Sequence, residues 1–144
     1  MSHPEMQIHH VLERYQSTVL AKDLEGFLRL YSDDIRIFDT WENWSHEGKD
    51  AWRRVVANWF SSLGEETVTV GLEQIQMTVG ADLAIASALV TYTAFSPVGE
   101  ALRSIQNRMS VALAKEGGDW LIVHEHTSVP IASGDMRAVT VKTV

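Results

Sequence analysis

The spacing of hydrophobic residues changes once along this chain, near Glu66. Before that point, apolar residues recur every three or four positions, which is typical of helices with one buried face. After it, they alternate with polar residues, which is typical of strands with two different faces. The order of helices followed by strands predicts an α+β domain.

The first part of the chain predicts three helices. The clearest runs from Trp52 to Leu63, where apolar residues stand three, four, seven, eight and eleven positions after the first. Another is expected over residues 5–22, with Tyr15 on its buried face. Asp23 has the side chain to cap a short helix after it. The segments between the helices are a predicted turn at residues 32–34, a short strand at 35–39 and an aromatic loop at 40–47.

The second part predicts four long strands joined by short turns. Gly80, Pro97 and Gly117 mark the three turns. Within the first of these strands, the apolar residues change parity near Glu73, which predicts a β-bulge and a bend in the sheet. The predicted strands cover residues 66–79, 83–96, 101–115 and 119–128.

Together, these elements predict a cone-shaped domain, in which a strongly bent antiparallel sheet wraps around three N-terminal helices. One helix cannot fill the concave side of such a sheet, so we expect a pocket there. The domain is expected to cover residues 1–131, and a polar C-terminal tail follows at residues 132–144.

Composition narrows the classes of partner and chemistry. A chain of 144 residues is long enough for one domain with a substantial core. Its net charge of -7 argues against a nucleic-acid partner, whose phosphates require a basic surface. The absence of cysteine excludes disulfides, a thiol nucleophile and thiolate metal ligands. Residues 1–7 lack signal-peptide features, and no apolar run is long enough to cross a membrane, so we expect a cytoplasmic protein.

The last predicted strand carries ionisable residues within an apolar segment. His124 and His126 share one face, whereas Glu125 lies on the other. Buried ionisable groups need partners, and a pocket is one place where their cost is tolerated. Two histidines at this spacing can also ligate a metal ion, with His46 or a carboxylate as a third ligand.

Several short motifs carry a resemblance to a known superfamily. Four segments stand as in the first half of ketosteroid isomerases: Arg14-Tyr15, Lys22 to Gly26, Leu30 to Asp34, and Phe38-Asp39. Three others are similar to the association domain of calcium/calmodulin-dependent kinases: Glu47 to Asp50, Asn58-Trp59, and Trp120 to His126. In this order, and over nearly the whole chain, they resemble the nuclear transport factor two-like superfamily, in particular its SnoaL-like and ketosteroid isomerase-related members.

The resemblance implies roles for three residues. Tyr15 matches the isomerase tyrosine that donates a hydrogen bond to the developing oxyanion, and Asp39 matches its general base. Ser110 takes the place of a protonated aspartic acid on the penultimate long strand. Because a major oxyanion donor is missing there, the resemblance does not imply steroid isomerisation itself.

The resemblance also orients the last strand. Glu125 would face the pocket together with Val123 and Thr127, whereas His124 and His126 would face the outer surface of the sheet. Members of this superfamily commonly dimerise through that surface. The last two predicted strands are apolar on both faces, so we expect a homodimer that covers the outer one.

Each candidate residue also has a structural interpretation. Asp39 is either a general base with a pKa raised by burial or an aspartate that caps a turn. Tyr15 is either a donor to the ligand or a core tyrosine whose hydroxyl has a neighbouring partner. Arg108 either binds a carboxylate or enolate of the ligand or pairs with Glu125 or Asp39. The predicted ligand-binding residues are Trp41, Trp59, Arg108, Ser110 and Glu125.

The leading hypothesis is a small SnoaL-like homodimer whose pocket binds a hydrophobic or aromatic carbonyl compound. With Asp39 as the base, and Tyr15 and Arg108 stabilising an enolate, it would act as an isomerase or cyclase by proton transfer, with no cofactor and no metal. The alternative is a non-catalytic ligand-binding or assembly module, similar to the kinase association domain. A metal-dependent cupin-like enzyme would share only the two histidines of the last strand. Whether the protein is an enzyme is left open by the sequence.

Overall fold

The first helices begin and end at residues suited to capping. A computed structural model describes residues 1–142 of the chain. Helix α1 (His3–Ala21) starts after Ser2, whose hydroxyl accepts a hydrogen bond from the Glu5 amide, and it ends at Lys22 in the left-handed conformation. Helix α2 (Leu24–Leu28) starts after Asp23, which accepts a hydrogen bond from the Gly26 amide as the sequence predicted.

Helix α3 (Lys49–Ser62) confirms the helix with the clearest hydrophobic period. Trp52, Val56 and Phe60 are buried on one side of it. The neighbouring Val55 and Trp59 are only partly buried, because they border a cavity rather than packed core. Phe27 of α2 packs edge-to-face against Phe60, which joins the two helices in one aromatic core.

Within residues 1–142, the sheet contains six strands in the order β2-β1-β6-β5-β4-β3. Strands β3 (Thr67–Val79), β4 (Leu83–Phe95), β5 (Ala101–Glu116) and β6 (Asp119–Ser128) form the predicted antiparallel meander. Strand β1 (Tyr31–Phe38) lies parallel to β6, so the sheet is mixed rather than wholly antiparallel. The short β2 (His46–Glu47) extends its edge beside β1.

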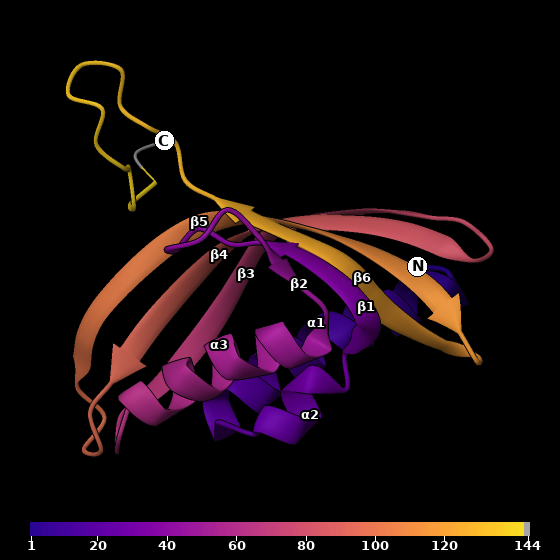
Figure 1. The fold of residues 1–144 in the computed structure, drawn as a ribbon, viewed down its shortest axis with the longest axis horizontal. Coiled ribbons are helices and arrows are strands. Elements are labelled where there is room, and N and C mark those ends of the chain that lie inside the picture. The colour runs from indigo at the N-terminus through magenta and orange to yellow at the C-terminus, as the bar shows by residue number, and fades with distance from the viewer. Residues whose placement is uncertain (143–144) are drawn as a thin grey trace.

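Figure 1 shows the sheet as an arch over the three helices, open along its sides, which is the predicted cone. The buried core combines side chains of the helices and the sheet, with Val19, Phe27, Tyr31 and Leu113 among its least exposed members. None of the helices within residues 1–142 combines the length and the apolar content that a membrane crossing requires.

The predicted turn at residues 32–34 is wrong, because β1 already begins at Tyr31. Its pairing with β6 is interrupted in this segment: Tyr31 pairs with Ile122, and the next paired residue, Arg36, faces His124. The polar residues therefore mark an irregularity inside a strand rather than the start of one.

The predicted bulge in β3 is confirmed. Register between β3 and β4 shifts between Glu73 and Gln76, and Gln74 adopts a left-handed backbone with φ of 54°. A second bulge lies in β6, where Ala112 pairs with His124 but Leu113 pairs with Ile122. Bulges bend a sheet, and these two help β3 and β6 to curve around the helices.

The tail beyond β6 lies along the uncovered edge of β5. β6 ends opposite Arg108, so the earlier residues of β5 have no strand on that side. The carbonyl of Thr140 accepts a hydrogen bond of 2.8 Å from the Gln106 amide there. This contact holds the tail near the wide end of the cone.

Candidate functional site

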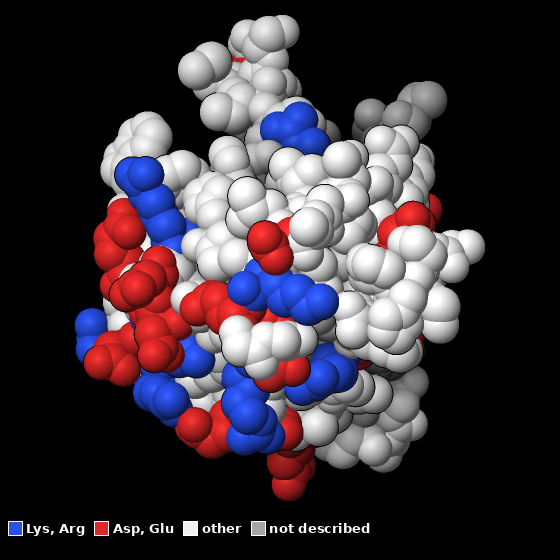
Figure 2. All heavy atoms as spheres, turned by 90° about the vertical axis from the view of Figure 1, so that its right-hand side faces the viewer, with Lys and Arg blue, Asp and Glu red and all other residues white. Residues whose placement is uncertain are grey.

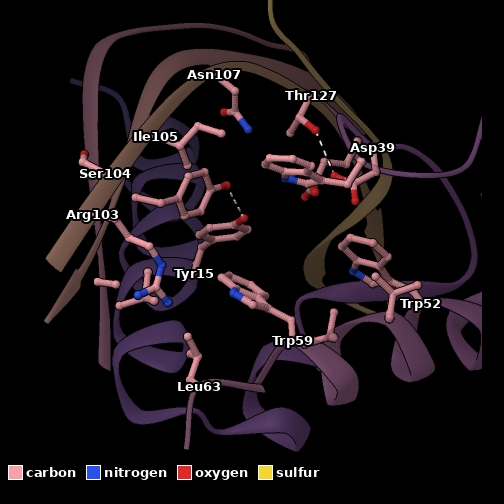
Figure 3. Close-up of a pocket in the computed structure, with 17 residues that line it drawn as sticks. Tyr15, Asp39, Trp52, Trp59, Leu63, Arg103, Ser104, Ile105, Asn107 and Thr127 are labelled. Carbon is pink, nitrogen blue, oxygen red and sulfur yellow. Dashed lines mark hydrogen bonds between the residues drawn. The ribbon is translucent and has the colours of Figure 1, made fainter. Parts of the chain in front are cut away.

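A cavity of about 540 Å³ lies between the helices and the concave face of the sheet (Figure 3). Its walls combine aromatic rings from the helices and the loop after β1 with polar side chains from the sheet. Tyr15, Asp39, Trp41, Trp59 and Glu125, which the sequence assigned to one site, all line it. The further lining residues include Trp52, Val56, Tyr92, Arg103, Asn107 and Thr127.

Asp39 follows directly on β1 and is held from one side. Its Oδ1 accepts hydrogen bonds from the Thr127 hydroxyl at 3.1 Å and from the Thr40 amide at 3.0 Å. Burial raises the pKa of the Asp39 carboxyl above its ordinary value, although both hydrogen bonds and the nearby His46 oppose the rise. Within residues 1–142, no hydrogen bond is made to Oδ2, which leaves that oxygen available to accept a proton from a ligand.

Glu125 is the most deeply buried ionisable residue of the cavity wall. It lies on β6, its side chain is almost inaccessible at 2% exposure, and its Oε1 accepts a 2.6 Å hydrogen bond from the Tyr31 hydroxyl. Burial, together with the charge of Asp39, raises the pKa of Glu125 to about 7, against the opposing effect of the Tyr31 hydrogen bond. No hydrogen bond to its Oε2 is present in the described part of the chain.

Two tyrosine hydroxyls meet at the cavity wall. Tyr15 of α1 and Tyr92 of β4 share a hydrogen bond of 2.9 Å (Figure 3). The pair contains two hydroxyl hydrogens and uses one between its members, so the other is free to be donated to a ligand. Burial raises the pKa of both phenols, so both remain protonated at neutral pH.

Three indole rings form much of the apolar wall. Trp52 and Trp59 project from α3, and Trp41 comes from the loop after β1. Trp41 is half-exposed, which places it at the mouth of the cavity, and Trp44 in the same loop is 97% exposed. The loop therefore presents aromatic area to solvent beside the entrance, where binding sites commonly place such residues.

The cavity has little positive charge to balance its two carboxylates. Among the lining residues of the described chain, Arg103 is the one lysine or arginine, and its guanidinium is bound to Glu66 at 2.6 Å. Its side chain is 60% exposed, which places it at the rim. The wall near Asp39 and Glu125 is therefore acidic or neutral.

The sequence placed Arg108 and Ser110 at the pocket, and the structure places both on the outer face of the sheet. Arg108 is exposed and donates a hydrogen bond to the Ser128 hydroxyl at 3.1 Å, so it pairs with neither Asp39 nor Glu125. The error has a clear cause in the parity of β5. Met109 and Val111 carry the buried face of that strand, and the small residues beyond Ser110 belong to the outer one.

The histidines of β6 face outward, as the resemblance implied. The His124 ring donates a 2.7 Å hydrogen bond from Nδ1 to the Arg36 carbonyl, and His126 is exposed. Both rings lie nearly at right angles to the ring of Phe38. His46 lies elsewhere, against Trp52. Residues 1–142 contain no group of three or more His, Cys, Asp or Glu side chains arranged to hold a metal ion.

Val123 does not join Glu125 and Thr127 at the cavity, although strict alternation predicted it. Val123 is the extra residue of the β6 bulge, so the strand buries both Ile122 and Glu125. Alternation is valid only within an uninterrupted strand, and a bulge reverses it.

Sequence reasoning missed Tyr92 and Asn107 as members of the site. Both are polar residues on an otherwise apolar inward face: Tyr92 follows Val90 on β4, and Asn107 precedes Met109 on β5. A polar residue in phase with buried apolar ones was the available signal. The small inward Ala94 of β4 lines the same cavity.

Comparison with known proteins gives a family match over most of the chain. Residues 8–132 match the model of the SnoaL-like domain. An NTF2-like protein of unknown function from Pseudomonas putida KT2440 has 26% identity and a TM-score of 0.83, with 94% of this chain and 93% of that chain covered. No curated protein matches the chain.

Two further structures are similar in fold. A candidate calcium/calmodulin-dependent protein kinase II association domain from Xanthomonas campestris has 16% identity and a TM-score of 0.72, with 84% of each chain covered. The protein Aln2 from a Streptomyces species has 12% identity and a TM-score of 0.76, with 89% of this chain and 93% of that chain covered. At these identities, the likeness extends to the fold alone.

Proposed function

We propose a function from one premise, which is that this chain belongs to the SnoaL-like family. Its cavity binds a hydrophobic or aromatic carbonyl compound and catalyses a proton transfer on it, as an isomerase or cyclase would. The observation that carries this proposal is the free oxygen of Asp39, which faces an apolar cavity also lined by a pair of tyrosine hydroxyls.

In this mechanism, Asp39 is the general base. Its Oδ2 takes a proton from the carbon next to the ligand carbonyl. The electron pair of that C–H bond forms the C=C bond of an enolate, while the π pair of the carbonyl moves onto its oxygen. The free hydroxyl hydrogen of the Tyr15–Tyr92 pair stabilises the enolate oxygen. Return of the proton from Asp39 to another carbon completes an isomerisation, and the enzyme ends unchanged.

Burial supports Asp39 in this role. A general base works best when its pKa approaches the working pH, and burial moves the pKa of Asp39 in that direction. Thr127 and Thr40 keep the carboxylate oriented by holding Oδ1 alone. The base is therefore fixed in position while its second oxygen is free.

Deuterium exchange tests this proposal without knowledge of the natural product. The ketone 2-tetralone in D₂O exchanges its α-hydrogens, and ¹H NMR follows their loss. We expect the protein to accelerate exchange and Asp39→Asn to reduce that acceleration by a factor of about 10² to 10⁴, the usual contribution of a general base. Binding of the ketone, followed by tryptophan fluorescence, should persist in Asp39→Asn because the shape of the cavity is kept.

Asp119→Asn is the matched control, since Asp119 is exposed at the far end of β6. It should leave exchange unchanged. Ketone binding without any accelerated exchange would contradict proton transfer and favour the non-catalytic ligand-binding module. If the ketone neither binds nor undergoes accelerated exchange, both the proton-transfer proposal and the ligand-binding alternative are contradicted.

We also propose that the protein is a homodimer through the outer face of the sheet. Leu83 is 68% exposed and Ile85 is 54% exposed on this face, and they pair across strands with Ala114 and Ala112. Leu121 lies beside Ala114 on the next strand, so the apolar row continues over three strands. A contiguous apolar surface of this kind favours burial against a second copy.

A further inference from the structure

Within residues 1–142, the two carboxylates of the cavity wall have no lysine or arginine partner. Glu125 is only 2% exposed, and within residues 1–142 its Oε2 receives no hydrogen bond although the residue lines the cavity. Asp39 lines the same space, and the guanidinium of Arg103 is engaged with Glu66 at the rim. A buried carboxylate is costly unless a cation or several donors compensate it.

The aromatic rings that line the same cavity as these carboxylates favour an organic cation. Tyr15, Trp41, Trp52, Trp59 and Tyr92 all line the one cavity, from both the helix side and the sheet side. The face of an indole ring attracts a cation more strongly than that of any other side chain, and aromatic cages of this kind bind ammonium groups. The aromatic rings and the carboxylates are independent features, and both favour a cationic ligand.

We propose that the ligand of this cavity carries a protonated amine, which binds Glu125 Oε2 among the indole rings. The inference rests on the proposed function for the cavity and for the roles of Asp39 and the tyrosine pair, and it adds an ammonium site at Glu125. Glu125 binds the ammonium group, Asp39 is left as the base, and the tyrosine pair receives the carbonyl oxygen. The ligand class is then an amphiphilic aromatic amino ketone, which keeps the carbonyl group of the proposed function and adds an ammonium group.

The alternatives fit the wall less well. An anionic group would lie beside two carboxylates and would have no free lysine or arginine among the described wall residues to bind. A neutral hydroxyl group of the ligand could form a hydrogen bond with Glu125, but it would leave the negative charge of the carboxylate uncompensated. Only an ammonium group both pairs with the carboxylate and gains from the ring faces.

The pH dependence of binding distinguishes these ligand classes. An ammonium group binds the ionised form of Glu125, whose pKa is about 7 in the free protein. The fraction of the protein in which Glu125 is ionised therefore increases between pH 6 and pH 8. The affinity for the amine should rise about tenfold over this range. The ionisable groups facing Glu125 are Tyr15, Tyr31, Tyr92 and Asp39, and the three phenols stay neutral throughout because burial raises their pKa values.

Three probes with one skeleton make the experiment: 2-naphthylmethylamine, 2-naphthylmethanol and 2-naphthoate, titrated against the intact protein by tryptophan fluorescence at pH 6, 7 and 8. We expect the amine to bind at least about tenfold more tightly than the alcohol at pH 8. We expect the naphthoate to be the weakest. The alcohol should lack the increase in affinity with pH.

Glu125→Gln keeps the shape of the side chain and removes its charge. In this variant, the amine should lose both its preference over the alcohol and its pH dependence, while alcohol binding persists. The exposed Glu73→Gln is the matched control and should behave as the wild type. If Glu125→Gln does not fold, the direction in which the amine affinity of the wild type changes with pH still tests the proposal.

Tighter binding of the alcohol or the naphthoate, or amine affinity that falls from pH 6 to pH 8, would overturn the amine inference. Accelerated exchange of 2-tetralone would leave the proposed function standing in that case. If none of the three probes binds, the inference fails, and the tetralone experiment then decides separately whether the cavity binds a ketone.

Discussion

Asp39 and Glu125 line one cavity but differ in solvation and in hydrogen bonding. Asp39 keeps two donors on one oxygen, from Thr127 and Thr40, and is partly open to the cavity mouth. Glu125 has one donor, the Tyr31 hydroxyl, and almost no exposed surface. Two carboxylates whose surroundings separate their pKa values are suited to different tasks.

Glu125 should make the stability of the protein depend on pH. Folding raises its pKa from an ordinary 4.5 to about 7, so the folded state holds this proton more tightly than the unfolded state. The free energy of unfolding should therefore fall as the pH rises from about 5 to 8, by on the order of 3 kcal/mol from this residue. Below pH 4.5 the penalty is absent, because the carboxyl is protonated in both states.

Urea unfolding of wild type and Glu125→Gln at pH 5 and pH 8 measures this effect. The variant should be more stable than the wild type at pH 8 and should lose less stability between the two values. A wild type that instead gains stability over this interval would show that Glu125 is not the dominant titrating group.

At the scale of elements, hydrophobic period predicted most of the fold. All four long strands and both long helices lie within a few residues of their expected bounds, because each carries several apolar side chains in phase. The capping role of Asp23 and the bulge near Glu73 were also readable, since each rests on local chemistry. The parallel pairing of β1 with β6 could not be predicted, because no local sequence signal indicates which distant strand a given strand will pair with.

The site was partly predictable for the same reason. Tyr15 and Trp59 lie on the inward stripes of their helices, so their place followed from periodicity. Arg108 was misplaced because it shares a parity with Ser110 and the small residues beyond it, which lie on the outer face of β5, whereas Met109 lies on the inner face. Val123 was misplaced because a bulge in β6 leaves no mark in the hydrophobic pattern.

Substitutions at Gln74 test the bulge in β3. Its φ of 54° lies in the left-handed region, which glycine adopts freely and β-branched residues adopt poorly. We expect Gln74→Gly to change the free energy of unfolding by less than about 0.5 kcal/mol and Gln74→Val to lower it by about 1 to 2 kcal/mol. Thermal or urea unfolding measures both, and equal stability of the two variants would contradict a required left-handed residue.

At the scale of the whole molecule, charge is unevenly distributed. Figure 2 shows acidic and basic side chains together on the lower part of one face, while its upper part, toward the sheet in Figure 1, is largely uncharged. No wholly basic area is visible on this face, in keeping with the net charge of -7.

Ile85→Arg tests the proposed homodimer. Ile85 is exposed on the outer face and pairs with Ala112, so an arginine there would place a charge on the apolar surface. Sedimentation at micromolar concentration should give a dimer for the wild type and a monomer for the variant, with naphthyl-probe binding unchanged. A monomeric wild type would contradict the dimer and leave the cavity assignments intact.

The parallel pairing of β1 with β6 also has a kinetic consequence. Ile37 is paired with Glu125, so residues from opposite ends of the chain must meet before both carboxylates border the same space. Contacts between such distant segments form late and slowly, since a long loop must close first. During synthesis, the helices and β1 emerge well before β6, and the chain has no complete binding site until its last strand docks. Recovery of probe binding after dilution from urea should therefore lag behind recovery of helical circular dichroism.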